Sequence, residues 1–450
     1  MLPYGVNVRS HDSLPRTAVI GAGSSGMVAL KALAEAGVPV TCFEKGDRVG
    51  GNWVFRNSNG MSASYKSLHI NTSRERMEYS DFPMPKHYPD FPHHSHVAEY
   101  FDTYVDHFDL RRHIRFSTGV ARAARTSDGW ELTLDDGTVE QFDALVVANG
   151  HHWDPRWPEP AFPGAAEFPG QQLHAHSFED NSDFPDKRVL VVGMGNSAMD
   201  IAVESSWVAT ATYLSARTPV HVIPKYVFGK PLDQIESAAM ARTLPWKARQ
   251  KLTAAMLKVA VGDYARYGLR RPEHGLLQAH ATVSDTILTR LAHGAVTAKP
   301  NLSRFEGSTA HFEDGTSAEV DVVVYATGYR ISFPFFDEEL VSAPDNRISL
   351  YQRVFHPTVP DLAFIGLIQP LGAIMPLAEE QGRLVADRLT GRYALPLLAE
   401  MQASIAKAQE AIDKRYVGRK RHTIQVDFEA YLHELRQERR RGAARVAATV

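Results

Sequence analysis

Two glycine-rich segments of the chain have the residue types and spacing that hold a nucleotide phosphate. They are Gly21-Ala-Gly-Ser-Ser-Gly26 and Gly193-Met-Gly-Asn-Ser-Ala198, and each follows a short β-branched run. The first glycine permits a tight turn, the second lets backbone approach a pyrophosphate, and the last small residue lets the helix pack on the strand. The N–H groups and dipole of the helix N-terminus favour the anion. The predicted contacts are Gly21, Gly23, Ser24, Ser25 and Gly26 in the first segment, and Gly193, Gly195, Asn196, Ser197 and Ala198 in the second.

The residues that end the next strand differ between the two segments. Glu44 stands at that place after the first segment, and a carboxylate there accepts hydrogen bonds from ribose hydroxyls and repels a 2′-phosphate. Arg217 and Thr218 stand there after the second segment, and a guanidinium suits the 2′-phosphate of NADP. The sequence therefore predicts FAD at the first segment and NADPH at the second. The alternative for Arg217 is a solvated surface arginine.

The hydrophobic pattern predicts the elements that position these residues. A strand over Thr17–Ile20, a helix ending near Gly37 and a strand over Val38–Phe43 form a strand-turn-helix-strand unit with parallel strands. The same order returns with strands over 189–192 and 212–216 and a helix between them. Asp-Gly turns at 136–137 and 314–315 predict a β-hairpin after each unit, followed by a closing strand.

These patterns predict an α/β fold with two Rossmann-like dinucleotide-binding domains in a chain of 450 residues. The NADPH domain is expected to be inserted in the FAD domain. Residues 1–158 form the first part of the FAD domain, and residues 159–328 form the NADPH domain with a helical insertion at about 232–300. Residues 329–450 are the C-terminal part of the FAD domain and a tail.

Composition narrows the classes of partner and compartment. A formal net charge of −3 gives no bias towards nucleic acid or an anionic membrane. The N-terminus lacks the apolar region of a secretory signal, and the most apolar stretch, Leu362–Ala378, is too short and too interrupted to span a membrane. Cys42 is the one cysteine, which rules out an internal disulfide and the disulfide reductases; it is expected to be a buried structural thiol. We therefore expect a cytoplasmic enzyme.

Two charged or histidine-rich runs are given structural interpretations. The segment His93-His94-Ser95-His96 lacks the spacing of zinc ligands, so we predict a helix entry capped by Ser95 and no metal. The run Arg439-Arg440-Arg441 is predicted to be a solvated helix end.

Three further segments make the chain resemble the flavin-containing monooxygenases, a type of class B flavoprotein monooxygenase with soluble bacterial-like members. They are Phe168-x-Gly170-x-x-x-His174-x-x-x-Phe178, Tyr65-Lys-Ser-Leu-His-Ile-Asn71 and Tyr325-Ala-Thr-Gly-Tyr329, and the resemblance runs from about Arg16 to Leu435. It implies NADPH- and O2-dependent oxygenation of soft nitrogen or sulfur atoms of a small amine or sulfide, through a C4a-hydroperoxyflavin. It also implies a homodimer.

The resemblance assigns roles to single residues. Asn71 matches the catalytic asparagine that faces the reactive edge of the flavin, although its amide could instead cap the turn Thr72–Arg76. The fingerprint residues are expected to be structural. The resemblance also assigns flavin contacts to Asn52, Trp53, Thr72 and Gln369. The fingerprint residues are Phe168, Gly170, His174 and Phe178.

Two other functions stay open at this stage. The related Baeyer-Villiger enzymes, which oxidise ketones, carry Trp-Pro where this chain has Phe178-Glu179. The second alternative is a protein that senses FAD and NADP without turnover.

A helix that begins near Pro376 is also predicted to aim its N-terminus at the flavin pyrimidine ring, where it would stabilise negative charge.

Overall fold

The computed structural model describes residues 14–235, 245–276, 278–279, 281–415 and 423–448. The chain divides into two compact units: unit 1 runs to Ser62 and includes Thr72–His151 and Ile331 onwards, and unit 2 is Ala63–Asn71 with His152–Arg330. Residues 63–71 were predicted to belong to the first domain. The structure packs this segment with unit 2, because the Lys66 N–H donates to the Glu179 carbonyl (2.8 Å) and Tyr65 is buried in that unit's core.

Unit 1 is built on a five-stranded sheet in which every strand pair is parallel. The order is β3-β2-β1-β7-β22, so the chain fills one side of β1 first and then the other. Ligands bind sheets of this type outside the carboxyl ends of the strands, at the point where the order reverses. That point lies between β1 and β7. The strands are β1 (Thr17–Ile20), β2 (Val40–Phe43), β3 (Ile114–Arg115), β7 (Ala144–Val147) and β22 (Leu362–Phe364).

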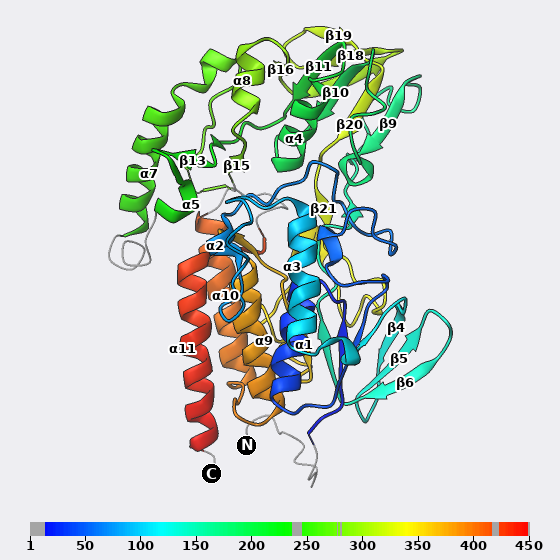
Figure 1. Cartoon of the computed structure of the whole chain (residues 1–450), viewed down its shortest axis with the longest axis vertical. Coiled ribbons are helices and arrows are strands. Elements are labelled where there is room, and N and C mark those ends of the chain that lie inside the picture. The colour runs from blue at the N-terminus through cyan, green and yellow to red at the C-terminus, as the bar shows by residue number, and fades with distance from the viewer. Residues whose placement is uncertain (1–13, 236–244, 277, 280, 416–422, 449–450) are drawn as a thin grey trace. The chain divides into compact units, whose positions relative to one another are not determined.

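The alternating side chains of this sheet pack on two different layers. Ala18, Ile20 and Phe43 join a core with the antiparallel sheet β4-β5-β6, which lies on one face (Figure 1). Helices α1 and α9 pack against each other so closely that a Cβ on Gly382 would lie 3.0 Å from the Val28 carbonyl oxygen. The elements named here are β4 (Val120–Arg125), β5 (Trp130–Leu134), β6 (Val139–Phe142), α1 (Ser24–Glu35) and α9 (Met375–Leu389).

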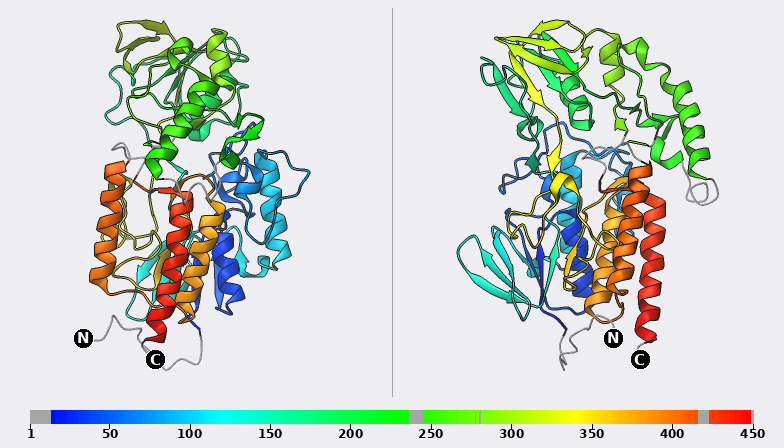
Figure 2. Two further views of the ribbon diagram at one scale, coloured as in Figure 1. Left: turned by 90° about the vertical axis from the view of Figure 1, so that its left-hand side faces the viewer. Right: turned by 180° about the vertical axis from the view of Figure 1, so that it is seen from behind.

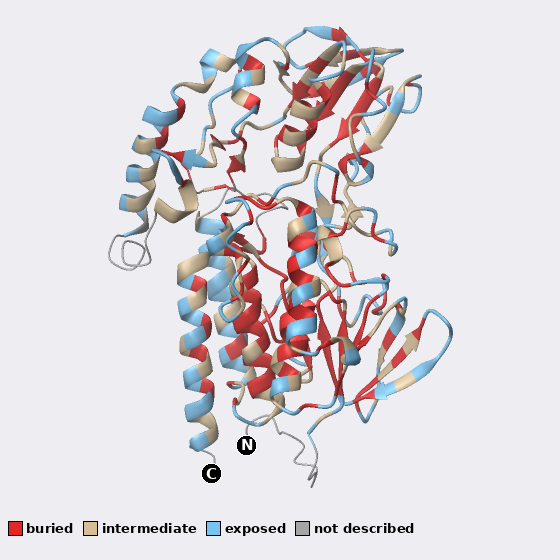
Figure 3. Cartoon of the chain, viewed as in Figure 1, coloured by how far each residue is buried: buried red, intermediate tan, exposed pale blue. Residues whose placement is uncertain are grey.

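The C-terminal helices complete unit 1. Helix α11 (Phe428–Ala447) lies beside α9 in both views of Figure 2. Figure 3 shows that its outward side is exposed, whereas α1 and the central strands of the parallel sheet, β1 and β7, are largely buried. The smaller elements are α2 (Arg74–Met77), α3 (His94–His107), α10 (Leu398–Arg415), β23 (Gln369–Leu371) and β24 (Gln425–Asp427), with 3-10 turns η1 (Gly51–Trp53), η2 (Arg111–His113) and η5 (Pro344–Asn346).

Unit 2 is also built on a five-stranded parallel sheet, in the order β16-β11-β10-β20-β9. Val189 and Val191 face α4 (Asn196–Ser205), whereas Leu190 and Val192 face the antiparallel sheet β17-β18-β19. The strands are β9 (Gln171–His174), β10 (Arg188–Val192), β11 (Ala211–Ser215), β16 (Thr297–Lys299), β17 (Leu302–Glu306), β18 (Thr309–Phe312), β19 (Ser317–Glu319) and β20 (Val322–Tyr325).

The expected helical insertion is a mixture of short elements. It contains helices and also strand pairs that the sequence pattern did not indicate. Part of the helical expectation, residues 236–244, lies outside the described residues. The elements of unit 2 not yet named are α5 (Leu232–Ile235), α7 (Trp246–Val261), α8 (Ile287–Ala292), η3 (Ala175–Ser177), η4 (Tyr264–Tyr267), β8 (Asp154–Pro155), β12 (Val222–Ile223), β13 (Tyr226–Val227), β14 (Lys230–Pro231), β15 (Thr282–Val283) and β21 (Tyr329–Arg330). Over the described residues, none of the helices has the length and apolarity needed to cross a membrane.

Candidate functional site

The first glycine turn of unit 1 joins β1 to α1 at the reversal of the strand order. Gly21 has φ +97°, and a Cβ there would lie 2.7 Å from the carbonyl oxygen of Ala148, which follows β7. A Cβ on Gly26 would come well inside 3.0 Å of the Gly21 carbonyl oxygen. Gly23 is different, because the nearest atom to a Cβ there is the Gly51 Cα at 3.8 Å. Gly21 and Gly26 thus allow close packing, whereas a Cβ on Gly23 would make only an ordinary contact with the loop at Gly51.

The same glycine turn is a helix end suited to an anion. Gly23 is the N-cap of α1 and provides no side-chain cap, and the first turn, which contains Ser24 and Ser25, has no acidic residue. The first N–H groups of a helix have no partner inside it, so a pyrophosphate can accept from them. The loop with η1 lies against the same turn, because the Gly50 N–H donates to the Ala22 carbonyl (3.0 Å). Asn52 and Trp53, both half-buried, are therefore brought to the first turn.

Glu44 places a buried negative charge beside this turn. The residue is 3% exposed and directly follows β2. Its Oε2 accepts from the Ala22 N–H (2.8 Å), and its Oε1 accepts from the Gly46 N–H (2.7 Å). These bonds hold the carboxylate at the turn, where it can accept from hydroxyl groups and repel a phosphate. Cys42 is fully buried as expected, and burial, with the nearby Glu44 charge, raises the pKa of its thiol, which makes it unreactive.

The second glycine turn has the same place in unit 2. Gly193 has φ +138°, and a Cβ there would come inside 3.0 Å of the carbonyl oxygen of Ala326, which follows β20. Gly195 is the N-cap of α4, again without a side-chain cap. Asn196 uses its side-chain oxygen to accept from the Val283 N–H (2.9 Å), whereas Ser197 is half-buried and Ala198 is fully buried against the core.

Backbone hydrogen bonds align the two turns residue by residue. The Gly21 N–H donates to the Phe43 carbonyl and the Gly193 N–H donates to the Ser215 carbonyl, each at 2.8 Å. The counterpart of Glu44 is therefore Ala216, which has no charge. Arg217 follows it, is exposed and forms no ion pair with any described residue, and Thr218 is half-buried. The corner that is acidic in unit 1 is thus basic in unit 2.

Asn71 and Thr72 lie where the chain passes from unit 2 to unit 1. Both are half-buried, and within the described chain neither side chain makes a hydrogen bond. The capping alternative for Asn71 is not seen, because α2 begins at Arg74 with Ser73 as its N-cap residue. The amide of Asn71 is therefore available to a ligand. Gln369 is half-buried in β23, where its backbone N–H donates to Ile424 (2.9 Å).

The fingerprint residues belong to the packing of unit 2. Phe168 and Phe178 are buried, Gly170 lies against the Asp321 carbonyl, and His174 is 2% exposed at the end of β9. The His174 Nδ1 accepts from the His176 N–H (3.1 Å). Burial lowers the pKa of His174 to about 4, so the ring is neutral at pH 7.

The predicted N-cap of the helix at the histidine run, Ser95, is wrong. Helix α3 begins at His94, and its N-cap is His93, whose Nδ1 accepts from the Ser95 N–H (3.3 Å). Ser95 is therefore inside the helix rather than its cap. Across the part of the chain that the structure describes, no cluster of three or more His, Cys, Asp or Glu side chains could hold a metal ion.

A hydrogen bond that no sequence pattern indicates joins the buried Tyr65 to the half-buried Asp200 on the helix of the second turn. The Tyr65 hydroxyl donates to Asp200 Oδ2 on α4. Desolvation raises the pKa of Asp200 to about 6 although the Tyr65 bond opposes this shift. The bond ties segment 63–71, which ends in Asn71, to α4. The separation of 135 residues explains why sequence reasoning missed it.

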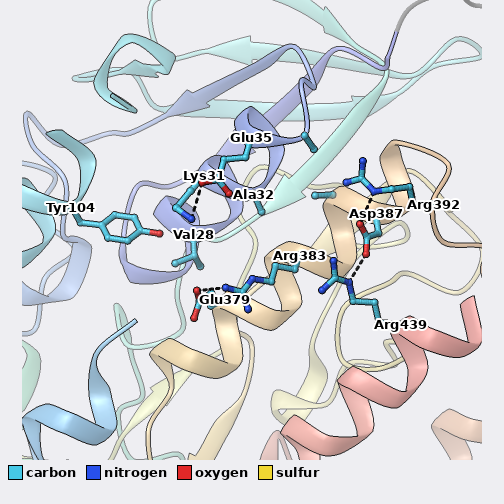
Figure 4. A pocket seen from close by; sticks show the side chains of 12 residues that line it. Val28, Lys31, Ala32, Glu35, Tyr104, Glu379, Arg383, Asp387, Arg392 and Arg439 are labelled. Atoms are coloured by element: carbon cyan, nitrogen blue, oxygen red, sulfur yellow. Dashed lines mark hydrogen bonds and ion pairs between the residues drawn. The ribbon is translucent and has the colours of Figure 1, made fainter. Parts of the chain in front are cut away.

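The cavity of Figure 4, about 320 Å³, is a different feature of unit 1. It lies along the C-terminal half of α1, so it is not at the glycine turn. Asp387 accepts from Arg392 Nε (2.9 Å) and from Arg439 Nε, and Arg383 pairs with Glu379 (2.7 Å). The prediction of a solvated helix end at 439–441 is therefore wrong: α11 continues to Ala447, so the run lies inside the helix, and the packing of α11 on α9 brings Arg439 to Asp387.

Comparison with known proteins gives consistent matches along nearly the whole chain. The model of the family described as flavin-binding monooxygenase-like matches residues 15–441. Human flavin-containing monooxygenase 5 is 41% identical over 438 residues, which are 93% of this chain and 82% of that protein. Mouse dimethylaniline monooxygenase [N-oxide-forming] 2 is 36% identical over 446 residues, or 94% and 82% of the two chains. The structure of S-allyl-L-cysteine S-oxygenase from Allium sativum has a TM-score of 0.71 and 25% identity, and it covers 96% of this chain and 92% of its own.

Proposed function

Because this chain belongs to the flavin-containing monooxygenase family, we propose that it uses NADPH and O2 to oxygenate a soft nitrogen or sulfur atom of a small amine or sulfide. The enzymes of this family use FAD and NADPH. The observation that carries the substrate class is the pair of relatives whose names state their chemistry. One is N-oxide-forming and 36% identical, and the other is an S-oxygenase with a TM-score of 0.71.

FAD is assigned to unit 1 and NADPH to unit 2, with the NADPH unit inserted in the FAD unit. The uncapped helix start at Gly23 and the buried Glu44 carboxylate support FAD in unit 1. The uncharged Ala216 and Arg217, which forms no ion pair with a described residue, support a 2′-phosphate in unit 2. Loop residues Asn52 and Trp53, together with Thr72 and Gln369, would complete the flavin contacts.

When bound, FAD supplies the redox chemistry of the family: it accepts hydride from NADPH and activates O2 for transfer of one oxygen atom. The chain's own residues bind, orient and shield. The N–H groups at the start of α1 would hold the pyrophosphate, and Glu44 would accept from the ribose hydroxyls. Asn71, whose amide makes no hydrogen bond to a described residue, is the proposed catalytic residue and would donate its N–H to the reacting cofactor.

Helix α9 adds a second positive helix end to the carboxyl edge of the unit 1 sheet. It follows β22 and packs on α1, so both helices start at that edge. Pro376 in its first turn removes one N–H from a position where it has no helical partner. The remaining N–H groups would stabilise negative charge on the flavin ring.

The lone pair of an amine or sulfide is itself the nucleophile in such a transfer, so the chain needs no catalytic serine, cysteine or strong base. What the chain must provide is a site that excludes water. This requirement distinguishes the proposal from hydrolytic chemistry.

The test is a two-step mixing experiment on the purified flavoprotein. NADPH added without oxygen should bleach the flavin absorbance at about 450 nm. Oxygen labelled with 18O is then added with a tertiary amine, a sulfide or a cyclic ketone, and the products are analysed by mass spectrometry. An N-oxide or sulfoxide that carries one labelled oxygen supports the proposal. A labelled lactone as the main product would establish Baeyer-Villiger oxidation instead, and a flavin that NADPH does not bleach would indicate a protein that only senses its nucleotides.

A further inference from the structure

We propose that Arg270 supplies a second guanidinium to the 2′-phosphate of NADPH, beside Arg217; the inference rests on the assignment of NADPH to unit 2. The Nη2 of Arg270 donates to the carbonyl oxygens of Ala216 (2.7 Å) and Arg217 (2.8 Å). The guanidinium therefore lies against the backbone at the end of β11, at the corner where unit 1 carries Glu44.

The charges at this corner are unbalanced in a way that an anion would correct. Within the described residues neither Arg217 nor Arg270 forms an ion pair, and both are exposed. The next residue, Arg271, shows the usual alternative, because it binds both carboxylate oxygens of Asp263. Two unpaired guanidinium groups at one strand end repel each other, and a phosphate between them offsets the repulsion. Both N–H bonds of the Arg270 Nη2 are used, whereas Nε and Nη1 still have donors for phosphate oxygens.

The backbone before Arg270 is fixed by packing, so this arginine is more ordered than an ordinary surface arginine. Leu269 is 6% exposed in the unit 2 core, and its N–H donates to the Tyr264 carbonyl (3.2 Å). Gly268 makes the turn that ends η4 with φ +74°. The Tyr264 hydroxyl donates to the Val222 carbonyl (2.9 Å) and anchors η4. Much of the entropy cost of ordering Arg270 is therefore met before the nucleotide binds.

The test compares two fragments of the coenzyme that differ only in the 2′-phosphate. Binding of 2′,5′-ADP and of 5′-AMP to the flavin-loaded protein is measured by calorimetry for the wild type, Arg270→Gln and Arg270→Lys. Arg271→Gln is the matched control, since it removes a neighbouring exposed arginine that already has a carboxylate partner. Thermal unfolding of each variant is recorded in parallel.

Arg270→Gln is expected to weaken 2′,5′-ADP by ~10- to 100-fold, the range for a lost hydrogen bond between charged groups, and to leave 5′-AMP unchanged. Arg270→Lys should retain part of the 2′,5′-ADP affinity, and Arg271→Gln should match the wild type for both ligands. Equal weakening of both fragments by Arg270→Gln would show that the residue only supports the backbone, and no change in either would remove it from the site; both results overturn the proposal. If the wild type itself did not prefer 2′,5′-ADP, the assignment of NADPH to unit 2 would be wrong instead.

Discussion

Replacing Gly23 or Gly26 by alanine adds the same methyl group to the same turn, but the two substitutions should have opposite consequences. At Gly26 the added Cβ meets the backbone carbonyl of Gly21, which is no flexible side chain and cannot move away cheaply. At Gly23 the Cβ fits, since the nearest atom is 3.8 Å away and the φ of −73° is one that alanine adopts readily.

The magnitudes follow from these contacts. Overpacking costs typically about 1–3 kcal/mol, and an interior helical glycine changed to alanine recovers up to about 1 kcal/mol. Because the clash at Gly26 is with backbone, the upper end of the cost applies, and Gly26→Ala should destabilise by about 2 kcal/mol. For Gly23→Ala, the poorer N-cap and the lower entropy of the unfolded chain oppose each other, so the net change should stay within about 1 kcal/mol. The methyl group would nevertheless occupy the space in front of the helix. Loss of N–H contacts to a pyrophosphate should then weaken FAD by at least about tenfold.

Two measurements separate these outcomes. Urea unfolding of the flavin-free proteins gives the stability, and flavin absorbance per chain after dialysis gives the retained cofactor. Gly23→Ala should unfold like the wild type and lose FAD, whereas Gly26→Ala should unfold at lower urea. Wild-type flavin affinity in Gly23→Ala would refute the placement of the pyrophosphate, and an unchanged midpoint for Gly26→Ala would refute the packing argument.

Three further predictions follow from single side chains. Asn71→Ala should keep FAD and oxidise NADPH but release hydrogen peroxide in place of product, and coupling equal to the wild type, measured as product per NADPH, would remove Asn71 from the site. Asp387→Asn should lower the free energy of unfolding by about 1–3 kcal/mol, since Asp387 is 90% buried as a side chain and holds Arg392 and Arg439; urea unfolding measures this, and an unchanged midpoint would show that the pairs contribute nothing. The His174 pKa of about 4 lies below the ordinary 6.5, so the unfolded chain binds a proton that the folded chain does not, and stability falls as the pH drops from 6.5 to 4, by at most about 3 kcal/mol. His174→Gln should flatten that pH dependence, and an unchanged slope of unfolding free energy against pH would contradict the reasoning.

Local chemistry in the sequence was sufficient for the parallel-sheet units and their turns. Strand β1 has the predicted bounds, and antiparallel pairs form at both Asp-Gly turns, because β-branched runs and Asp-Gly turns act over a few neighbouring residues. The glycine spacing likewise located both helix starts, at Ser24 and Asn196. The family was also readable in the sequence, because its motifs are short and continuous.

The tertiary structure alone decided which distant residues meet. The glycine spacing predicted that Gly26 packs closely and that Gly23 stays accessible, but it did not reveal that the loop at Gly51 lies 3.8 Å from a Cβ on Gly23 or that the Ala148 carbonyl encloses Gly21. The sequence predicted a solvated helix end at Arg439, whereas α11 continues to Ala447 and its packing on α9 brings Arg439 to Asp387. Arg270 reaches the end of β11 although 53 residues separate it from Arg217. Contacts of this kind depend on the path of the whole chain, and residue types and spacing carry no information about that path.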